Sequence, residues 1–168
     1  YSLLLLAFTS RSSLGVLPAT IDTLTQKLGV SQGTASFVSS FGTTAGMQGC
    51  AGVFPALLIV YVANTSGTPI DISLIIMSII VITIGSIGIA GIPGTSTMAA
   101  SVGLSGVGLG ASFAFITPIL AIDPIIDMMR TMLNVSGSLT NAIMVDRQLE
   151  LMDMELYQDM AGKESEKE

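Results

Sequence analysis

The stretch 121–140 carries charges of both signs in surroundings that are otherwise apolar or small. Asp123 and Asp127 are carboxylates, and Arg130 is a guanidinium. A ligand ammonium group is bound well by a carboxylate, and a ligand carboxylate is bound well by the two-pronged donor geometry of a guanidinium. These residue types therefore predict a binding site for an amino acid.

The spacing of the polar residues places them on one side of a helix. At about 100° per residue, the polar positions fall within an arc of roughly 100°. They are Asp123, Asp127, Arg130, Thr131, Asn134 and Ser138. Ile125, Ile126, Met129 and Leu133 fall outside the arc. The stretch therefore predicts a helix with one polar stripe and an apolar face toward lipid or neighbouring helices.

A structural interpretation of the same charges stays open. A charge at the centre of a bilayer costs roughly 2.5–3.5 kcal/mol unless it is paired or hydrated. An internal ion pair that only holds helices together would explain Arg130 and one carboxylate. It would not explain the second carboxylate, Thr131 and Asn134, so the pattern favours a binding site.

The elements that position these residues are expected to lie in a membrane. Only 11% of the 168 residues are charged, against roughly 25% in a typical soluble domain, and half of the charged residues follow Arg147. The stretch 72–92 has 21 residues without a charge, about the length of a helix that crosses a hydrocarbon core. Several further apolar blocks in so short a chain favour membrane segments over the core helix of a soluble protein.

Four interruptions by Gly, Ser or Pro divide the apolar blocks. They lie at 9–18, 46–49, 88–97 and 123–124. In lipid, such breaks persist only where protein or a wet cavity covers them. Ser13 and Met47 are 34 residues apart, as are Pro93 and Asp127. The pattern predicts two copies of a unit, each a hairpin too short to cross followed by a helix broken near its middle, which is typical of transporter binding sites.

The breaks divide the chain into five predicted segments. They are a partial first re-entrant hairpin (1–30), a broken transmembrane helix (31–64), a second re-entrant hairpin (70–109), a substrate-binding transmembrane helix (110–149) and an acidic tail (150–168). Lys27 and Arg147 indicate which ends are cytoplasmic, so the tail is expected to be a frayed, solvated cytoplasmic end. Because Tyr1 stands within an apolar run, we expect the chain to be the C-terminal part of a longer protein.

Other functional classes fit the sequence poorly. A single cysteine and no histidine give neither a disulfide framework nor the usual metal-site spacings, and no basic patch indicates nucleic acid. An intramembrane aspartyl protease needs two Asp that face each other across the site, whereas Asp123 and Asp127 are one turn apart. A channel would favour rings of like charge. Both stay remote alternatives, and no catalytic residue is predicted.

Four motifs in order resemble the dicarboxylate/amino acid:cation symporter family, the glutamate transporter homologues. The two re-entrant hairpin tips of that family are similar to SRSSLGVLP (10–18) and GIAGIPGTST (88–97). Its seventh, broken helix is similar to FGTTAGMQGCAG (41–52), and its eighth helix to IDPIIDMMRTMLNVSGSLT (122–140). Within the family, the chain most resembles the bacterial L-cystine uptake transporters. The resemblance implies an all-α membrane protein, the C-terminal half of a transport domain with two re-entrant helical hairpins and two broken transmembrane helices.

The resemblance also implies the residues of a substrate site. They are Ser12, Ser13, Cys50, Ile92, Gly94, Ser96, Asp127, Arg130, Thr131 and Asn134. Asp127 would bind the substrate ammonium, Arg130 the distal carboxylate, and Asn134 with Ser13 the α-carboxylate. Because cystine has an amino acid group at each end, Arg130 suits its second carboxylate.

The second hairpin tip is expected to close over the substrate as an extracellular gate, through the backbone at Ile92 and Gly94 with Ser96 nearby. Cys50 stands where members for acidic substrates have a Thr, and it is expected to form a wall of the site. Purely structural roles stay open. The two serines of the first tip could serve simply to cap a helix, and the glycines of the second could serve simply to allow close packing.

The coupling cation is sodium or a proton. Sodium-coupled members carry Asn-Met-Asp-Gly where this chain has GMQG at 46–49, and an Asp where it has Ser138. Since sodium favours oxygen ligands that include carboxylates, two sodium sites are expected to be lost. A third site, made largely of backbone carbonyls, could persist at Thr44, Met47, Ser86, Ile87 and Ile89. Alternatively Asp123 or Asp127 would carry a proton, and we lean toward a reduced stoichiometry that includes one.

The sequence thus predicts a secondary active transporter, not an enzyme, that imports L-cystine by alternating access in the cell membrane. Aspartate or glutamate is the alternative substrate. The expected partners are the amino acid and the lipid bilayer, with a homotrimer formed through an N-terminal scaffold outside this chain. No organic cofactor is expected.

Overall fold

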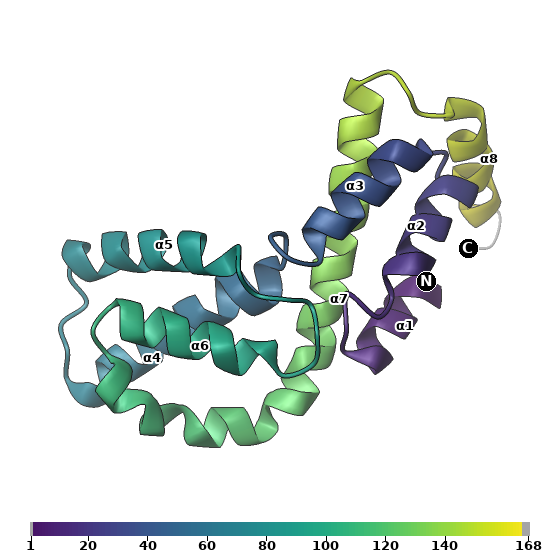
Figure 1. Ribbon diagram of the computed structural model, residues 1–168. Coiled ribbons are helices and arrows are strands. Elements are labelled where there is room, and N and C mark those ends of the chain that lie inside the picture. Colours follow the sequence, from purple (N-terminus) through teal and green to yellow (C-terminus); the bar gives the residue numbers. More distant parts are fainter. Residues whose placement is uncertain (1, 166–168) are drawn as a thin grey trace.

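The computed structural model describes residues 2–165, and this part of the chain is helical throughout, as the sequence predicts (Figure 1). The helices are α1 (Ser2–Ser10), α2 (Leu17–Gln26), α3 (Gln32–Gly42), the π-helix η1 (Gln48–Val53), α4 (Phe54–Ser66), α5 (Ile72–Ser86), α6 (Thr95–Gly106), the 3-10 helix η2 (Gly110–Ile116), α7 (Thr117–Gln148) and α8 (Met154–Ser165).

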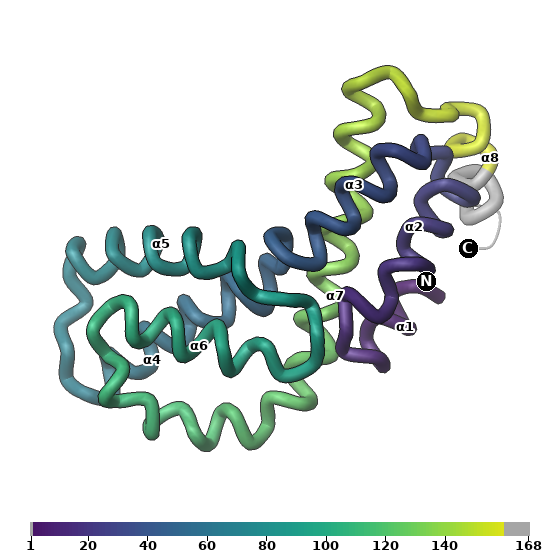
Figure 2. The backbone as a smooth tube through the Cα atoms, in the orientation of Figure 1, coloured from purple at the N-terminus to yellow at the C-terminus, as the bar shows by residue number. Residues whose placement is uncertain are grey.

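The helices form two arms that share α7 (Figure 2). In one arm α1 and α3 pack on α7, and in the other α4 and α5 pack on α6. Each arm contains one helical hairpin, α1–α2 in the first and α5–α6 in the second (Figure 1). The tips of both hairpins point toward the middle of α7, so two segments far apart in sequence meet at the charged helix.

The second hairpin forms because α5 stops early. Asp71 begins α5 as an N-cap, since its side chain accepts a hydrogen bond of 2.8 Å from the Leu74 amide, and the helix ends at Ser86. Its 15 residues span about 22 Å at 1.5 Å per residue, less than the roughly 30 Å of a hydrocarbon core. The stretch 72–92 is therefore one arm of a hairpin and not a complete membrane span.

The first predicted helix break is confirmed, and the second is wrong. α3 ends at Gly42, and a non-helical segment precedes the π-helix η1. In contrast, α7 continues without interruption through Pro124. A proline removes one backbone N–H and commonly bends a helix instead of ending it, and Figure 1 shows α7 changing direction in its N-terminal half.

Two helical stretches of the described chain are long and apolar enough to cross a membrane by length and composition. They are Gln48–Ser66 and Gly110–Gln148. Between them lies the largest apolar core, in which Phe54, Leu58 and Ile59 of α4 pack with Leu104 and Ile116.

The acidic tail differs from the frayed end that its composition predicts. Its described part contains α8, and the Asp153 amide donates a hydrogen bond of 2.8 Å to the Gly29 carbonyl. The Asp153 carboxylate accepts from the amides of Glu155 and Leu156 at 3.1 and 3.0 Å, which satisfies free N–H groups at the helix start. The last residues of the predicted tail, 166–168, lie outside the described chain.

Candidate substrate-binding site

The polar stripe predicted for the charged helix is confirmed. All six of its residues are buried in the structure: Asp123, Asp127, Arg130, Thr131, Asn134 and Ser138. On the opposite face, Ile125, Met129 and Leu133 are 71%, 59% and 46% exposed. α7 therefore turns its polar side to the protein and its apolar side outward.

Four charged side chains meet at the middle of α7. Arg130 Nη2 donates to Asp123 Oδ1 at 2.6 Å and to Asp127 Oδ1 at 3.3 Å. The second oxygen of Asp127 lies 3.2 Å from Nε and 3.2 Å from Nη2 of Arg11. The cluster is formally neutral, with two cations and two anions. Arg130 is thus paired with both aspartates inside the protein, and Arg11 of the first hairpin joins the same cluster.

The pairing leaves Arg130 incompletely satisfied. Its Nε and Nη1 are buried and have no hydrogen-bond partner in the structure, while the Phe54 ring lies 3.9 Å from Cζ and covers one face of the guanidinium. A buried donor without a partner costs free energy, so the ion pairs of Arg130 leave part of that cost uncompensated within the described residues.

The broken helix contributes a chain of hydrogen bonds to the same site. The Gly49 amide donates to Asn134 Oδ1 at 2.8 Å, and Asn134 Nδ2 donates to Cys50 Sγ at 3.1 Å. Cys50 Sγ in turn lies 3.7 Å from Asp127 Oδ1. A Cβ at Gly49 would stand 3.0 Å from the Arg130 carbonyl oxygen, so the absence of a side chain there allows η1 to approach α7 this closely.

The two hairpin tips touch each other over α7. The Gly91 carbonyl accepts hydrogen bonds from the Leu14 amide at 3.0 Å and from Ser12 Oγ at 3.1 Å. Ser96, in the first turn of α6, donates to Asp123 Oδ2 at 2.7 Å. Ser12 also accepts from the Gly15 amide at 2.9 Å, whereas the N-cap of α2 is Val16. The two serines of the first tip therefore do not cap α2.

A narrow cleft lies between these tips and α7, and it is closed so tightly that it has no room for a water molecule. Its lining residues are Arg11, Ser13, Met47, Cys50, Gly91, Ile92, Thr95, Asp127, Thr131 and Asn134. Six of the ten predicted substrate-site residues are among them. Ser12, Ser96 and Arg130 lie beside the cleft through the contacts given above. Gly94 is exposed, with a φ of 84°, and a Cβ added to it would have no atom within 4 Å.

Arg11 is the main residue that the sequence prediction missed. It is the only charged residue among the first 21. A charge in an apolar membrane segment is costly, and this cost, which singled out the charged residues of α7, could also have singled out Arg11. The structure adds Gly91 and Thr95 of the second hairpin to the cleft as well.

The residues of the predicted sodium site lie in different surroundings. Met47 and Ile89 are buried in one apolar cluster with Cys50. Thr44 is exposed and donates to the Phe41 carbonyl at 3.1 Å. Ser86 donates to the Thr83 carbonyl at 2.9 Å and Ile87 is exposed. Within residues 2–165, no group of three or more His, Cys, Asp or Glu is placed to hold a metal ion.

The two positions where sodium-coupled members carry carboxylates hold neutral donors here. Gln48 Nε2 donates to the Leu133 carbonyl at 2.7 Å, and Ser138 Oγ donates to the Asn134 carbonyl at 3.3 Å. Both groups direct a hydrogen at a carbonyl of α7.

Comparison with known proteins is consistent with this geometry. The model of the Sodium:dicarboxylate symporter family matches residues 1–148. Similar proteins include the L-cystine uptake protein TcyP of Bacillus thuringiensis (strain Al Hakam), 41% identical over 94% of this chain and 34% of the relative. The TcyP proteins of Bacillus licheniformis and Shouchella clausii are 41% and 42% identical, each over 95% of this chain and 34% of the relative. The chain therefore spans about a third of the length of the curated relatives that it matches.

Proposed function

This chain belongs to the Sodium:dicarboxylate symporter family, and from that membership we propose that it forms the substrate-binding part of a secondary transporter that imports L-cystine. The family is one of transporters and not of enzymes. The relatives are named L-cystine uptake proteins, which supports the choice of substrate.

The observation that carries the proposal is the neutral charge cluster with its two unpaired arginine nitrogens. Arg130 Nε and Nη1 are buried without a partner, and Arg130 donates to Asp127, which lines the cleft. A ligand carboxylate is the group that matches a guanidinium of this kind. The carboxylate of Asp127 lies on the wall of the adjoining cleft and suits a ligand ammonium.

The remaining roles follow from where the side chains lie. Asn134 and Ser13 line the cleft beside Asp127 and would bind the α-carboxylate, while Thr131 and Cys50 would form its walls. Ile92, Gly94 and Ser96 belong to the second tip, which would close over the substrate as a gate. Alternating access would expose the cleft to each side of the membrane in turn.

The membrane arrangement is part of the same proposal. The pairs α1–α2 and α5–α6 would be re-entrant hairpins, with α3–η1–α4 and α7 as the helices that cross. The C-terminus would be cytoplasmic, and the rest of the protein would supply a scaffold through which three copies associate in the cell membrane.

Competition of labelled L-cystine uptake by the full-length transporter tests the substrate. Unlabelled cystine is expected to compete fully, and aspartate, glutamate and cysteine weakly. The acidic amino acids are the second candidate, because Arg130 would bind a side-chain carboxylate equally well. Stronger competition by glutamate or aspartate than by cystine would favour them.

The coupling ion requires a separate measurement. Sodium and proton gradients imposed one at a time on vesicles that contain the transporter should identify the driving cation. The neutral Gln48 and Ser138 lead us to expect a reduced cation stoichiometry that includes a proton. Uptake that is indifferent to both gradients would exclude symport.

A further inference from the structure

We propose that Asp123 binds the second ammonium group of the substrate, so that the site selects molecules with a complete amino acid group at each end. This inference rests on the proposed function and deepens it, because it assigns a specificity role to a carboxylate that would otherwise serve only as a partner of Arg130 or a carrier of a proton.

The two carboxylates of the cluster are not equivalent. Asp127 has two cationic partners, Arg11 and Arg130, whereas the structure shows Arg130 as the one cationic partner of Asp123 among the described residues. The other oxygen of Asp123 accepts from the neutral hydroxyl of Ser96 at 2.7 Å. A ligand carboxylate bound to Arg130 would therefore compete with Asp123 for that cation.

Charge balance then favours an ammonium group beside Asp123. The cluster of two arginines and two aspartates is formally neutral, and three of its residues are buried while the Arg11 side chain is 25% exposed. A ligand with one ammonium and two carboxylates would bring a net negative charge into this site, which a co-transported cation would have to offset. A ligand with two ammonium and two carboxylate groups is neutral, and its second ammonium would restore a cation to Asp123.

The covalent structure of an amino acid brings the two contacts together. Arg130 holds Asp123 through Nη2 at 2.6 Å, and its free donors, Nε and Nη1, lie on either side of that nitrogen. In an amino acid the ammonium and carboxylate groups are bonded to the same carbon. A distal carboxylate at one of the free donors would therefore bring its own ammonium toward Asp123, while the proximal end would lie at Asp127, Thr131 and Asn134 once the tips separate.

Three ligands separate this role from that of a residue that only positions Arg130. They are L-cystine, the mixed disulfide of L-cysteine with 3-mercaptopropanoate, which lacks the second ammonium, and the mixed disulfide of L-cysteine with cysteamine, which lacks the second carboxylate. Their dissociation constants are measured on the purified full-length transporter, for the wild type and for Asp123→Asn, Ser96→Ala and Asp22→Asn. Asp22 lies outside the cluster, on α2, and is the matched control for the loss of one carboxylate.

The wild type is expected to bind cystine at least tenfold more tightly than the mercaptopropanoate disulfide, the effect of about one charged hydrogen bond. Asp123→Asn should bind cystine and the mercaptopropanoate disulfide with about equal affinity, because the variant loses affinity for cystine and not for the mercaptopropanoate disulfide. Ser96→Ala and Asp22→Asn keep the carboxylate of Asp123 and should keep the preference.

Two results would overturn the inference. In one, the wild type binds cystine and the mercaptopropanoate disulfide equally, which needs no variant and so does not depend on the folding of Asp123→Asn. In the other, Asp123→Asn weakens both ligands by the same factor, which assigns Asp123 to positioning alone. If the wild type binds none of the three ligands, the proposed function itself fails, and this inference fails with it.

Discussion

The two hairpins approach the same helix but are held in different ways. In the first, α1 buries Leu3 and Ala7 in an apolar cluster with Val135 of α7, and Arg11 at the tip is paired with Asp127. In the second, α5 buries no residue. Packing and charge therefore fix the first hairpin, whereas the outer arm of the second packs on α6 without burying any of its own residues.

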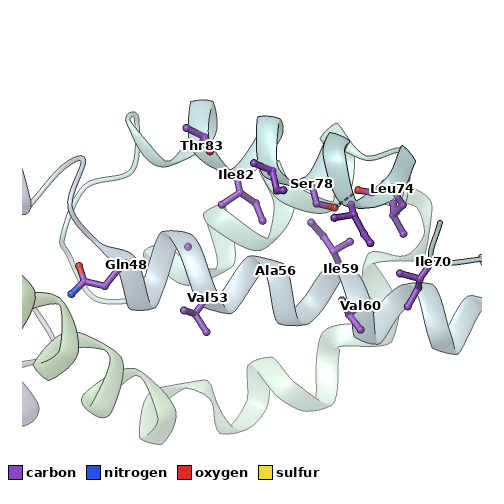
Figure 3. Close-up of a pocket in the computed structure, with 13 residues that line it drawn as sticks. Gln48, Val53, Ala56, Ile59, Val60, Ile70, Leu74, Ser78, Ile82 and Thr83 are labelled. Atoms are coloured by element: carbon purple, nitrogen blue, oxygen red, sulfur yellow. Dashed lines mark hydrogen bonds between the residues drawn. The ribbon is translucent and has the colours of Figure 1, made fainter. Parts of the chain in front are cut away.

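The second hairpin is also bordered by open space. An apolar groove of about 580 Å³ runs between α4 and α5, with Val53, Ile59 and Ile82 among its lining residues (Figure 3). The tip of this hairpin is held by hydrogen bonds to the Gly91 carbonyl and from Ser96. The inner arm α6 is anchored in the core through Ala100 and Leu104, but Ile92 and Gly94 at the tip are exposed. Exposed segments open at low free-energy cost, so we expect the second tip to open while the first stays in place.

Arg130→Ala should have the largest effect, because this side chain connects to both hairpins. It reaches Arg11 through Asp127 and Ser96 through Asp123. Its removal leaves two buried carboxylates short of positive charge, and we expect cystine affinity to fall by at least about 100-fold, as for a broken buried ion pair. Neutral amino acids, which have no distal carboxylate, should lose less. Titration of the full-length protein with both ligand types measures this, and equal cystine affinity of variant and wild type would refute the role of Arg130.

Arg11→Ala tests whether charge fixes the first hairpin. Loss of its contact to Asp127, a partly exposed ion pair, should weaken cystine binding by about tenfold. Arg11 also has a φ of 56°, which is unfavourable for any residue with a Cβ. Arg11→Gly should therefore lose the same affinity but melt at a higher temperature than Arg11→Ala. Melting at the same temperature would show that the backbone at the tip is not strained.

Much of the candidate site was predictable from the sequence, because it follows from local chemistry. The spacing of Asp127, Arg130 and Asn134 predicted the buried stripe, and the glycines and prolines predicted where each hairpin turns. The motifs that resemble the symporter family supplied the candidate substrate-site residues, six of which the structure brings together at one cleft.

The parts that could not be predicted depend on long-range contacts. The pairing of Arg11 with Asp127 joins residues 116 positions apart, and no periodicity reports it. A proline within a helix ends it or bends it according to its neighbours, so Pro124 was predicted as a break but produces a bend. The order of the tail depends on the docking of Asp153 on Gly29, which its composition does not reveal.

Gly91→Ala tests the contact between the two tips. A Cβ at this position would stand 2.8 Å from the Thr43 carbonyl and 3.1 Å from Ser13 Cβ, so the second tip must move away. We expect a several-fold loss of cystine affinity and faster labelling of a cysteine introduced at the exposed Ile92, measured in a Cys50→Ala background. Gly94→Ala is the matched comparison, because Gly94 has open space around it but a φ of 84°. It should cost about 1 kcal/mol of stability without separating the tips. Equal labelling in both variants would show that Gly91 does not hold the tips together.

Ser96→Ala should have the smallest effect and is the most direct measure of how the second hairpin is held. The substitution removes one hydrogen bond to Asp123 and leaves every charge in place, so a net change of about threefold to tenfold is expected. If the bond holds the tip closed, the change should appear mainly in the dissociation rate of cystine, because a gate that opens more often releases ligand sooner. Ser136→Ala removes a hydroxyl that bonds the carbonyl of Leu133 in its own helix and should leave that rate unchanged. A slower association rate with unchanged dissociation would instead mean that Ser96 helps to form the empty site, and the second hairpin would then be as firmly fixed as the first.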